Sequence, residues 1–179
     1  MGTGQLMLLT KTEAYRFQTS DYSLLPPSPL SFARVGNRQL EPAVASNGND
    51  FLVAWIDQQA TILGSTERDV YAVRVRGSNG AVLGPPIPLS VTAPDAEFVS
   101  VASNGLDYMV VWQELEGANT RIRGTRVRAS DSMALDGTPE TGGVPLDLSA
   151  SGGVHYREPV VASDGVNYLV AWLDSSTGY

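Results

Sequence analysis

A stretch of twelve residues occurs three times along the chain, at residues 44–55, 101–112 and 161–172. Each copy begins with Val-Ala-Ser, continues with Asn-Gly or Asp-Gly, and ends in Trp. The Asn-Gly or Asp-Gly pair suits the positive φ angles of a tight turn between two strands. Because successive side chains of a strand point to opposite faces, each second strand carries apolar residues on both faces. Each copy therefore predicts a β-hairpin that is covered on both sides.

The spacing of the copies indicates the architecture. Equivalent tryptophans are separated by 57 residues (112 − 55) and by 60 residues (172 − 112). Units of this length made of strands favour propeller blades over solenoid coils, whose repeats are about 20–30 residues long. The sequence therefore predicts an all-β, β-propeller-like fold with about three four-stranded blades. Trp55, Trp112 and Trp172 are expected to be buried between stacked sheets.

The repeat divides the chain into four segments. Residues 41–96 and 97–157 are expected to be complete units, which we call repeats 1 and 2. Residues 1–40 match the second half of a preceding blade, and residues 158–179 match the first hairpin of a third repeat. Together they form one propeller domain or part of one. On this division the chain starts and ends in mid-blade.

Three blades are too few to close a ring, because propellers have about four to eight. An open stack exposes an apolar sheet face at each end. We therefore expect that the chain is part of a longer protein or that copies of it associate as a homo-oligomer. In the second case residues 158–174 of one copy pair with residues 14–31 of another, so that two chains close a ring with two-fold symmetry.

Composition narrows the choice of partners. The formal net charge of −7 argues against nucleic acid, which is bound by basic surfaces. No apolar run is long enough for a membrane span, which takes about 18 residues or more, so membrane insertion is not expected. Residues 1–10 lack the basic start and apolar run of a signal peptide. The chain has no cysteine, which excludes disulfides and thiolate metal sites.

The repeat also resembles a known group of proteins. The pattern Pro-x-Val-Ala-Ser-x-Gly-x-x-Tyr-Leu-Val-x-Trp-x-Asp, followed by Asp-Val-Tyr-Ala-x-Arg-Val, resembles the β-propeller-like repeats of large bacterial secreted and surface proteins. The resemblance covers nearly everything from residue 41 onward and implies an extracellular or cell-surface setting. It carries no catalytic residues to transfer. The second copy departs from the pattern, with Phe98-Val99 where the others have Glu41-Pro42 and Glu158-Pro159.

Charged residues that recur in every unit are expected to maintain the scaffold. Asp57, Glu114 and Asp174 each lie two residues after a repeat Trp. Pairing with an arginine of the neighbouring strand, such as Arg74 or Arg126, is favoured over a catalytic pair of carboxylates at a central channel. A cluster of four arginines is expected to face solvent or carboxylates rather than an anionic glycan: Arg121, Arg123, Arg126 and Arg128.

The turns do not predict a metal site. Asn-Gly and Asp-Gly could be fragments of calcium loops, but the Asp-x-Asp-x-Asp-Gly spacing that gathers oxygen ligands is absent. Turn geometry explains these residues fully. We therefore expect no metal, no cofactor and no catalytic residue.

Departures from a repeat are where function should be sought, because the scaffold does not require them. His155, Tyr156 and Arg157 precede the third repeat at positions where the other units have Arg-Gln-Leu and Asp-Ala-Glu. A lone histidine without a nucleophile motif is most often an ordinary surface residue. These three residues are the candidates for a binding site.

The leading functional prediction is a non-catalytic binding module for a glycan, peptide or protein, since propellers present variable loops on a rigid ring. The first alternative is a structural segment of a large bacterial surface protein with no ligand of its own. The second alternative is a carbohydrate-active propeller enzyme. It is disfavoured because no acidic residue breaks the repeat at a plausible strand start, so the chain is not expected to be an enzyme.

Overall fold

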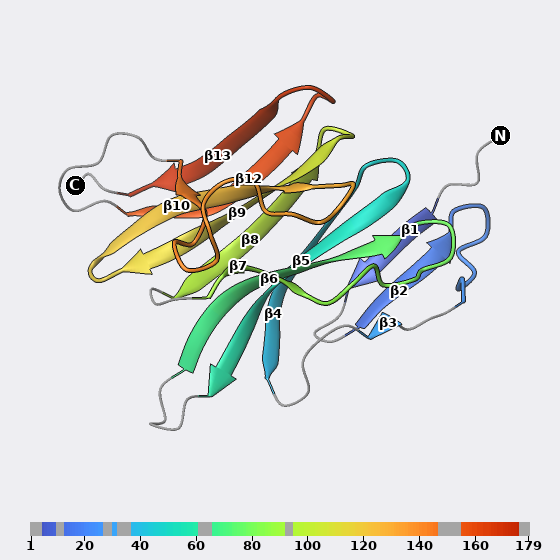
Figure 1. Cartoon of the computed structure of the whole chain (residues 1–179), viewed down its shortest axis with the longest axis horizontal. Coiled ribbons are helices and arrows are strands. Elements are labelled where there is room, and N and C mark those ends of the chain that lie inside the picture. Colours follow the sequence, from blue (N-terminus) through green and yellow to red (C-terminus); the bar gives the residue numbers. More distant parts are fainter. Residues whose placement is uncertain are drawn as a thin grey trace.

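The computed structural model describes residues 5–9, 13–26, 30–31, 37–60, 66–91, 95–146 and 155–175 (Figure 1). Every regular element within these ranges is a β-strand, and the strands form four antiparallel sheets. No helix in the described part of the chain is long and apolar enough to cross a membrane.

Each sheet is assembled from strands that are consecutive in the sequence. The first sheet contains β1 (Gln5–Leu9), β2 (Glu13–Gln18) and β3 (Leu30–Ser31). The second contains β4 (Arg38–Ser46), β5 (Asp50–Ala60), β6 (Thr66–Arg76) and β7 (Ile87–Ser90). The third contains β8 (Ala96–Ser103), β9 (Asp107–Glu116), β10 (Asn119–Arg128) and β11 (Val144–Pro145). The fourth contains β12 (Tyr156–Ser163) and β13 (Tyr168–Asp174).

The arrangement of the sheets confirms the predicted all-β, propeller-like fold. β8 contacts both β4 and β12, and these first strands of three consecutive sheets are called the inner strands below. The remaining strands follow in order toward the outside of each sheet (Figure 1). In this register the first sheet holds the second to fourth strands of a blade, and the last sheet holds the first two. The chain therefore starts and ends in mid-blade, as predicted.

The placement of β1 bears on the predicted dimer. That prediction pairs residues 158–174 of one copy with residues 14–31 of another. β1 pairs along β2, with Leu6 opposite Phe17 and Leu8 opposite Tyr15, while β3 pairs on the other side. Both edges of β2 are therefore occupied within the chain, so an added strand would have to pair with an edge strand of this sheet, β1 or β3, instead. A homo-oligomer remains a prediction.

The repeated hairpin turns have the geometry that their residues predict. In the first turn the Ser46 hydroxyl accepts a hydrogen bond from the Gly48 N–H (3.0 Å). The Asn47 side-chain oxygen accepts the N–H groups of Asn49 (3.0 Å) and Asp50 (2.7 Å). Gly48 has a φ of 90°, which a residue with a Cβ rarely adopts. The other two turns repeat these contacts, so turn geometry accounts for the Asn-Gly and Asp-Gly pairs.

Apolar side chains fill the space between neighbouring sheets. The Trp55 face of β5 packs against Ala14 and Leu30 of the first sheet. The opposite face of β5 packs against the third sheet, where Trp112 is fully buried. Trp172 is only half-buried and packs against Tyr156, with 5.8 Å between the ring centroids. The predicted burial is thus confirmed for two tryptophans and wrong for Trp172, because β13 has a neighbouring strand on one side only in the described chain.

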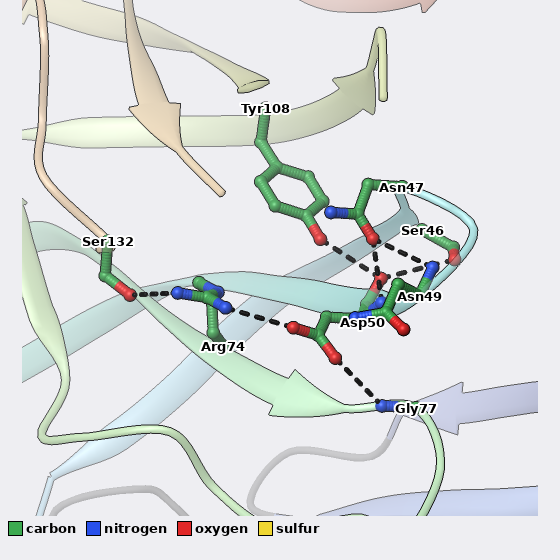
Figure 2. Close-up of polar contacts among 8 residues, drawn as sticks. All are labelled: Ser46, Asn47, Asn49, Asp50, Arg74, Gly77, Tyr108 and Ser132. Carbon is green, nitrogen blue, oxygen red and sulfur yellow. Dashed lines mark hydrogen bonds and ion pairs between the residues drawn. The ribbon is translucent and has the colours of Figure 1, made fainter. Parts of the chain in front are cut away.

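Polar contacts also join each sheet to the one before it. The Tyr108 hydroxyl donates a hydrogen bond to the Asp50 carbonyl oxygen (3.0 Å), and Tyr168 donates to the Asp107 carbonyl (2.8 Å). Burial raises the pKa of the Tyr108 hydroxyl well above its usual range. The Asp50 carboxylate in turn pairs with Arg74 at 3.0 Å (Figure 2). This repeated contact fixes the stacking of the sheets at the hairpin end.

Candidate functional site

The three inner strands share a bulge at the same place in the repeat. The register between each inner strand and the strand that follows it shifts at residues 41–42, 98–99 and 158–159. The first residue of each bulge lies in the left-handed region: Glu41 at φ 50°, Phe98 at 55° and Glu158 at 51°. Residues with a Cβ adopt this conformation only when their surroundings enforce it, and such strain gathers at functional sites. Bulges also redirect a side chain away from the regular pleat.

Hydrogen bonds hold the bulges in place. A carboxylate oxygen of Glu41 accepts the backbone N–H of Phe98 on the next inner strand. On the strand after that, the Glu158 N–H donates to the side-chain oxygen of Gln113 (3.2 Å). The carboxylate of Glu158 has no hydrogen bond within the described residues. Side-chain hydrogen bonds at the bulges therefore join β8 to β4 and β12 to β9.

A cavity of about 290 Å³ lies where the inner strands converge, and we call it the axial cavity. All its described lining comes from the bulges and their neighbours: Glu41, Pro42, Phe98, Val99, Ser100, Glu158, Pro159 and Val160. Two glutamates from equivalent positions thus border the same space as the exposed ring of Phe98. Sequence reasoning did not select Glu41 and Glu158 as site residues. The signal was the recurring Glu-Pro and its replacement by Phe98-Val99 in the middle copy.

A second cavity of about 350 Å³ lies between the third and fourth sheets, and we call it the inter-sheet cavity. Phe98 and Glu158 line both cavities, so the two spaces adjoin. The remaining described lining consists of Glu97, Gln113, Leu115, Thr120 and Arg157.

The structure separates the three binding candidates. Arg157 lines the inter-sheet cavity. Tyr156 packs on Trp172 instead. The carbonyl oxygen of His155 accepts hydrogen bonds from the N–H (3.1 Å) and the hydroxyl (3.0 Å) of Ser175. Of the three residues, Arg157 is the one placed at a cavity.

The other charged candidates are engaged in the scaffold. Glu114 pairs with Arg123 of the neighbouring strand at 2.9 Å, which is the kind of pair predicted. Asp57 is fully buried and accepts a hydrogen bond from Asn37 (2.5 Å) instead of an arginine. Arg74, the predicted partner, pairs with Asp50. Each arginine of the predicted cluster faces a carboxylate: Arg121 with Glu116, Arg123 with Glu114, Arg126 with Asp136 and Arg128 with Asp131.

Comparison with known proteins gives a fold relationship. No family model and no curated protein sequence matches the chain. Among solved structures, a thermostable family-43 glycoside hydrolase superposes with a TM-score of 0.52 at 9% identity, covering 96% of this chain and 65% of the hydrolase. An α-L-arabinofuranosidase from Lactobacillus brevis gives a TM-score of 0.49 at 9% identity, covering 94% of this chain and 57% of the enzyme. The chain thus spans less than two thirds of the length of either protein.

This comparison corrects the leading functional prediction. The sequence favoured a non-catalytic binding module, whereas a solved structure that shares the fold is a glycoside hydrolase. The argument against an enzyme was that no acidic residue breaks the repeat at a strand start. That argument fails because an acidic residue does not have to depart from the repeat to reach a cavity. Glu41 and Glu158 occupy equivalent positions of the repeat, and both lie on bulges that line the axial cavity. The residue that breaks the repeat there is Phe98.

Proposed function

We propose that the chain acts on glycosides, with Glu41 and Glu158 as a pair of catalytic carboxylic groups. The observation that carries this proposal is the position of both glutamates, on strained bulges, at the one axial cavity. Hydrolysis of a glycosidic bond generally needs two such groups on either side of the bond. The fold shared with a glycoside hydrolase supports the assignment. The extracellular setting implied by the resemblance of the repeats would suit a polymeric substrate.

The surroundings of the two glutamates assign different roles to them. One Glu41 oxygen accepts the backbone N–H of Phe98, so this group has a hydrogen-bond donor beside it that favours a negatively charged acceptor. Glu41 is therefore the base that removes a proton from the attacking water. Glu158, which has no such bond within the described chain, donates its proton to the oxygen of the leaving group. The glycosidic C–O bond breaks while the water oxygen bonds to the anomeric carbon, so hydrolysis consumes one water.

The strand order supports attack by water over attack by Glu41 itself. β8 contributes Phe98 to the cavity between the strands that carry the two glutamates. Carboxyl groups about 6.5–9.5 Å apart leave room for a water and invert the anomeric configuration, whereas groups about 5–5.5 Å apart retain it. We therefore expect inversion, which proton NMR of the first-formed sugar would detect.

The test is hydrolysis of a panel of p-nitrophenyl pentosides, hexosides and hexuronides by the full chain and by Glu41→Gln, Glu158→Gln and Glu67→Gln variants. Removal of a general acid or base typically costs about 10²–10⁴-fold in rate. We expect losses in that range for the first two variants. Glu67 is exposed on β6 and is not part of the cavity lining, so its variant should keep the wild-type rate.

Two outcomes would contradict the proposal. One is the absence of hydrolysis of every glycoside by the wild-type chain, which would favour the structural-segment alternative. The other is a Glu158→Gln variant with the activity of the wild type. Circular dichroism of each variant distinguishes lost chemistry from lost folding.

A further inference from the structure

The contact that joins the second sheet to the third includes an ion pair. Arg68 of β6 pairs through its guanidinium with the carboxylate of Glu97 on β8. The Arg68 backbone N–H donates to the Asp95 side chain (3.1 Å). Glu97 also accepts a hydrogen bond from Gln113 (3.3 Å). The space between these two sheets is thus closed by the arginine side chain.

The equivalent position between the third and fourth sheets has different residues. In the strand register Arg68 is opposite Gln58, and its counterpart Thr120 is opposite Leu115. Glu97 is opposite Gln113, and its counterpart Arg157 is opposite Leu173. A threonine therefore replaces the arginine of the pair, and an arginine replaces the glutamate. The short side chain of Thr120 cannot fill the space that Arg68 fills.

The inter-sheet cavity lies at this site and contains two donors without partners. Thr120 is 6% exposed, and its hydroxyl has no hydrogen-bond partner in the described part of the chain. The guanidinium of Arg157 forms no hydrogen bond or ion pair with any described residue. Both side chains line the cavity. A buried hydroxyl normally has a hydrogen-bond partner. A buried hydroxyl that lacks one and borders a cavity therefore indicates that a ligand or solvent molecule in the cavity is its partner.

The charges of the lining determine the class of ligand. Glu97 is already paired with Arg68, and Gln113 is already bonded on both sides of its amide group. The lining has two other charged residues, Glu158 and Arg157. Glu158 is the proton donor of the proposed function, so Arg157 supplies the positive charge of this lining that lacks a partner among the described residues. An arginine and a hydroxyl that border one cavity suit a carboxylate, which accepts several hydrogen bonds at once.

We propose that the inter-sheet cavity is a subsite for a uronic acid residue, whose carboxylate accepts hydrogen bonds from Arg157 and Thr120. The choice of a sugar rests on the proposed function. Because Phe98 and Glu158 border both cavities, a sugar in this subsite is next to a sugar in the axial cavity. The substrate class is then a glycan that contains uronic acid.

Binding is measured by isothermal titration of the full chain with methyl glucuronide and methyl galacturonide, and with the matching neutral methyl glycosides. A hydrogen bond to a charged group typically changes affinity by about tenfold or more. We expect each uronide to bind at least about tenfold more tightly than its neutral counterpart. Arg157→Gln should remove that preference, and Thr120→Val should weaken uronide binding several-fold. Arg128→Gln, which alters an exposed arginine outside the cavity, is the matched control and should bind as the wild type does.

A rebuilt ion pair gives the sharpest test. The double variant Thr120→Arg with Arg157→Glu copies the Arg68–Glu97 pair and fills the cavity. We expect this variant to fold with an unchanged or higher melting temperature and to lose uronide binding. Uronide binding that survives in the double variant, or an Arg157→Gln variant that still prefers uronides, overturns the proposal. Equal binding of neutral and acidic sugars, or no binding of either, overturns it as well.

The outcome can be separated from that of the proposed hydrolysis. The Glu41→Gln variant lacks the proposed base but keeps every residue of the inter-sheet cavity. If it binds uronides while the wild type hydrolyses nothing, the subsite stands and the proposed function fails. If the wild type hydrolyses neutral glycosides but does not bind uronides, the proposed function stands and the subsite fails.

Discussion

The buried ion pair between Asp50 and Arg74 predicts a large loss of stability when one partner is removed. Their side chains are 8% and 11% exposed and 3.0 Å apart (Figure 2). Asp50 also accepts the Gly77 N–H at 3.3 Å, and Arg74 donates to the Ser132 hydroxyl at 3.2 Å. An Asp50→Asn substitution keeps the shape and an acceptor oxygen but leaves the arginine charge buried and uncompensated.

The expected magnitude follows from that geometry. Breaking a buried pair by removing one partner costs about 3–5 kcal/mol. Because Ser132 continues to accept one Arg74 hydrogen bond, we expect the lower end, about 3 kcal/mol, for Asp50→Asn. Arg74→Met should cost a similar amount of stability, because it leaves the Asp50 carboxylate buried without its partner. The double variant should lose less stability than the sum of the two single variants, by about 1–3 kcal/mol, because it removes both charges and leaves neither one unpaired.

Urea unfolding followed by tryptophan fluorescence measures these costs as shifts of the midpoint at constant slope. The exposed pair between Arg126 and Asp136, with side chains 46% and 22% exposed at 2.8 Å, is the control. Asp136→Asn should cost only about 0.2–1 kcal/mol, since solvent screens this pair. The reasoning is refuted if Asp50→Asn costs no more than Asp136→Asn, or if the two buried substitutions are simply additive.

Three further predictions concern stability. Trp112→Ala should lower the free energy of unfolding by about 3–5 kcal/mol. Trp172→Ala should lower it less, because that ring is only half-buried; equal losses in urea unfolding would contradict the packing. Gly143→Ala should cost at least about 2 kcal/mol, because φ is +65° and a Cβ would lie 2.5 Å from the Gly124 oxygen and 2.8 Å from the Trp112 ring; an unchanged melting temperature refutes this. The hydrogen bond from Arg126 lowers the pKa of Asp136 in the folded protein. The stability that ionised Asp136 contributes is therefore present above the unfolded pKa of about 3.9 and disappears as the pH falls through the lower folded value. In unfolding measurements, the difference in stability between the wild type and Asp136→Asn should shrink below about pH 4.

The hairpins could be predicted from sequence because their determinants are local. A Ser-Asn-Gly turn fixes its own hydrogen bonds through Ser46, Asn47 and the φ of Gly48, all within five residues. The regular spacing of the tryptophans then predicted that the sheets stack on one another. The incomplete burial of Trp172 could not be read from this pattern, because burial depends on which strands lie beside β13.

The candidate site was hidden for two physical reasons. A positive φ is usually signalled by glycine, but the inner-strand bulges place Glu41, Phe98 and Glu158 there and hold them by contacts from other strands. The equivalence of Arg68 and Thr120 is also obscured in the sequence. They are 52 residues apart (120 − 68), whereas the tryptophans of the same sheets are 57 apart (112 − 55). Only the strand register reveals that the two residues occupy the same position.

The structure also explains why one interface between sheets can lose its ion pair. The Arg68 and Glu97 side chains are 29% and 23% exposed, and pairs of that kind contribute little net stability. Other contacts hold the third and fourth sheets together. They are the hydrogen bonds from Tyr168 to the Asp107 carbonyl, from the Val161 N–H to the Ser100 hydroxyl and from the Glu158 N–H to Gln113. Replacing the pair by Thr120 and Arg157 therefore costs the stack little, while it opens a cavity next to Glu158. A repeated scaffold can acquire a binding site most readily at a position of this kind, where the contact that is lost was weak and the carboxyl group proposed as the proton donor, that of Glu158, is already adjacent.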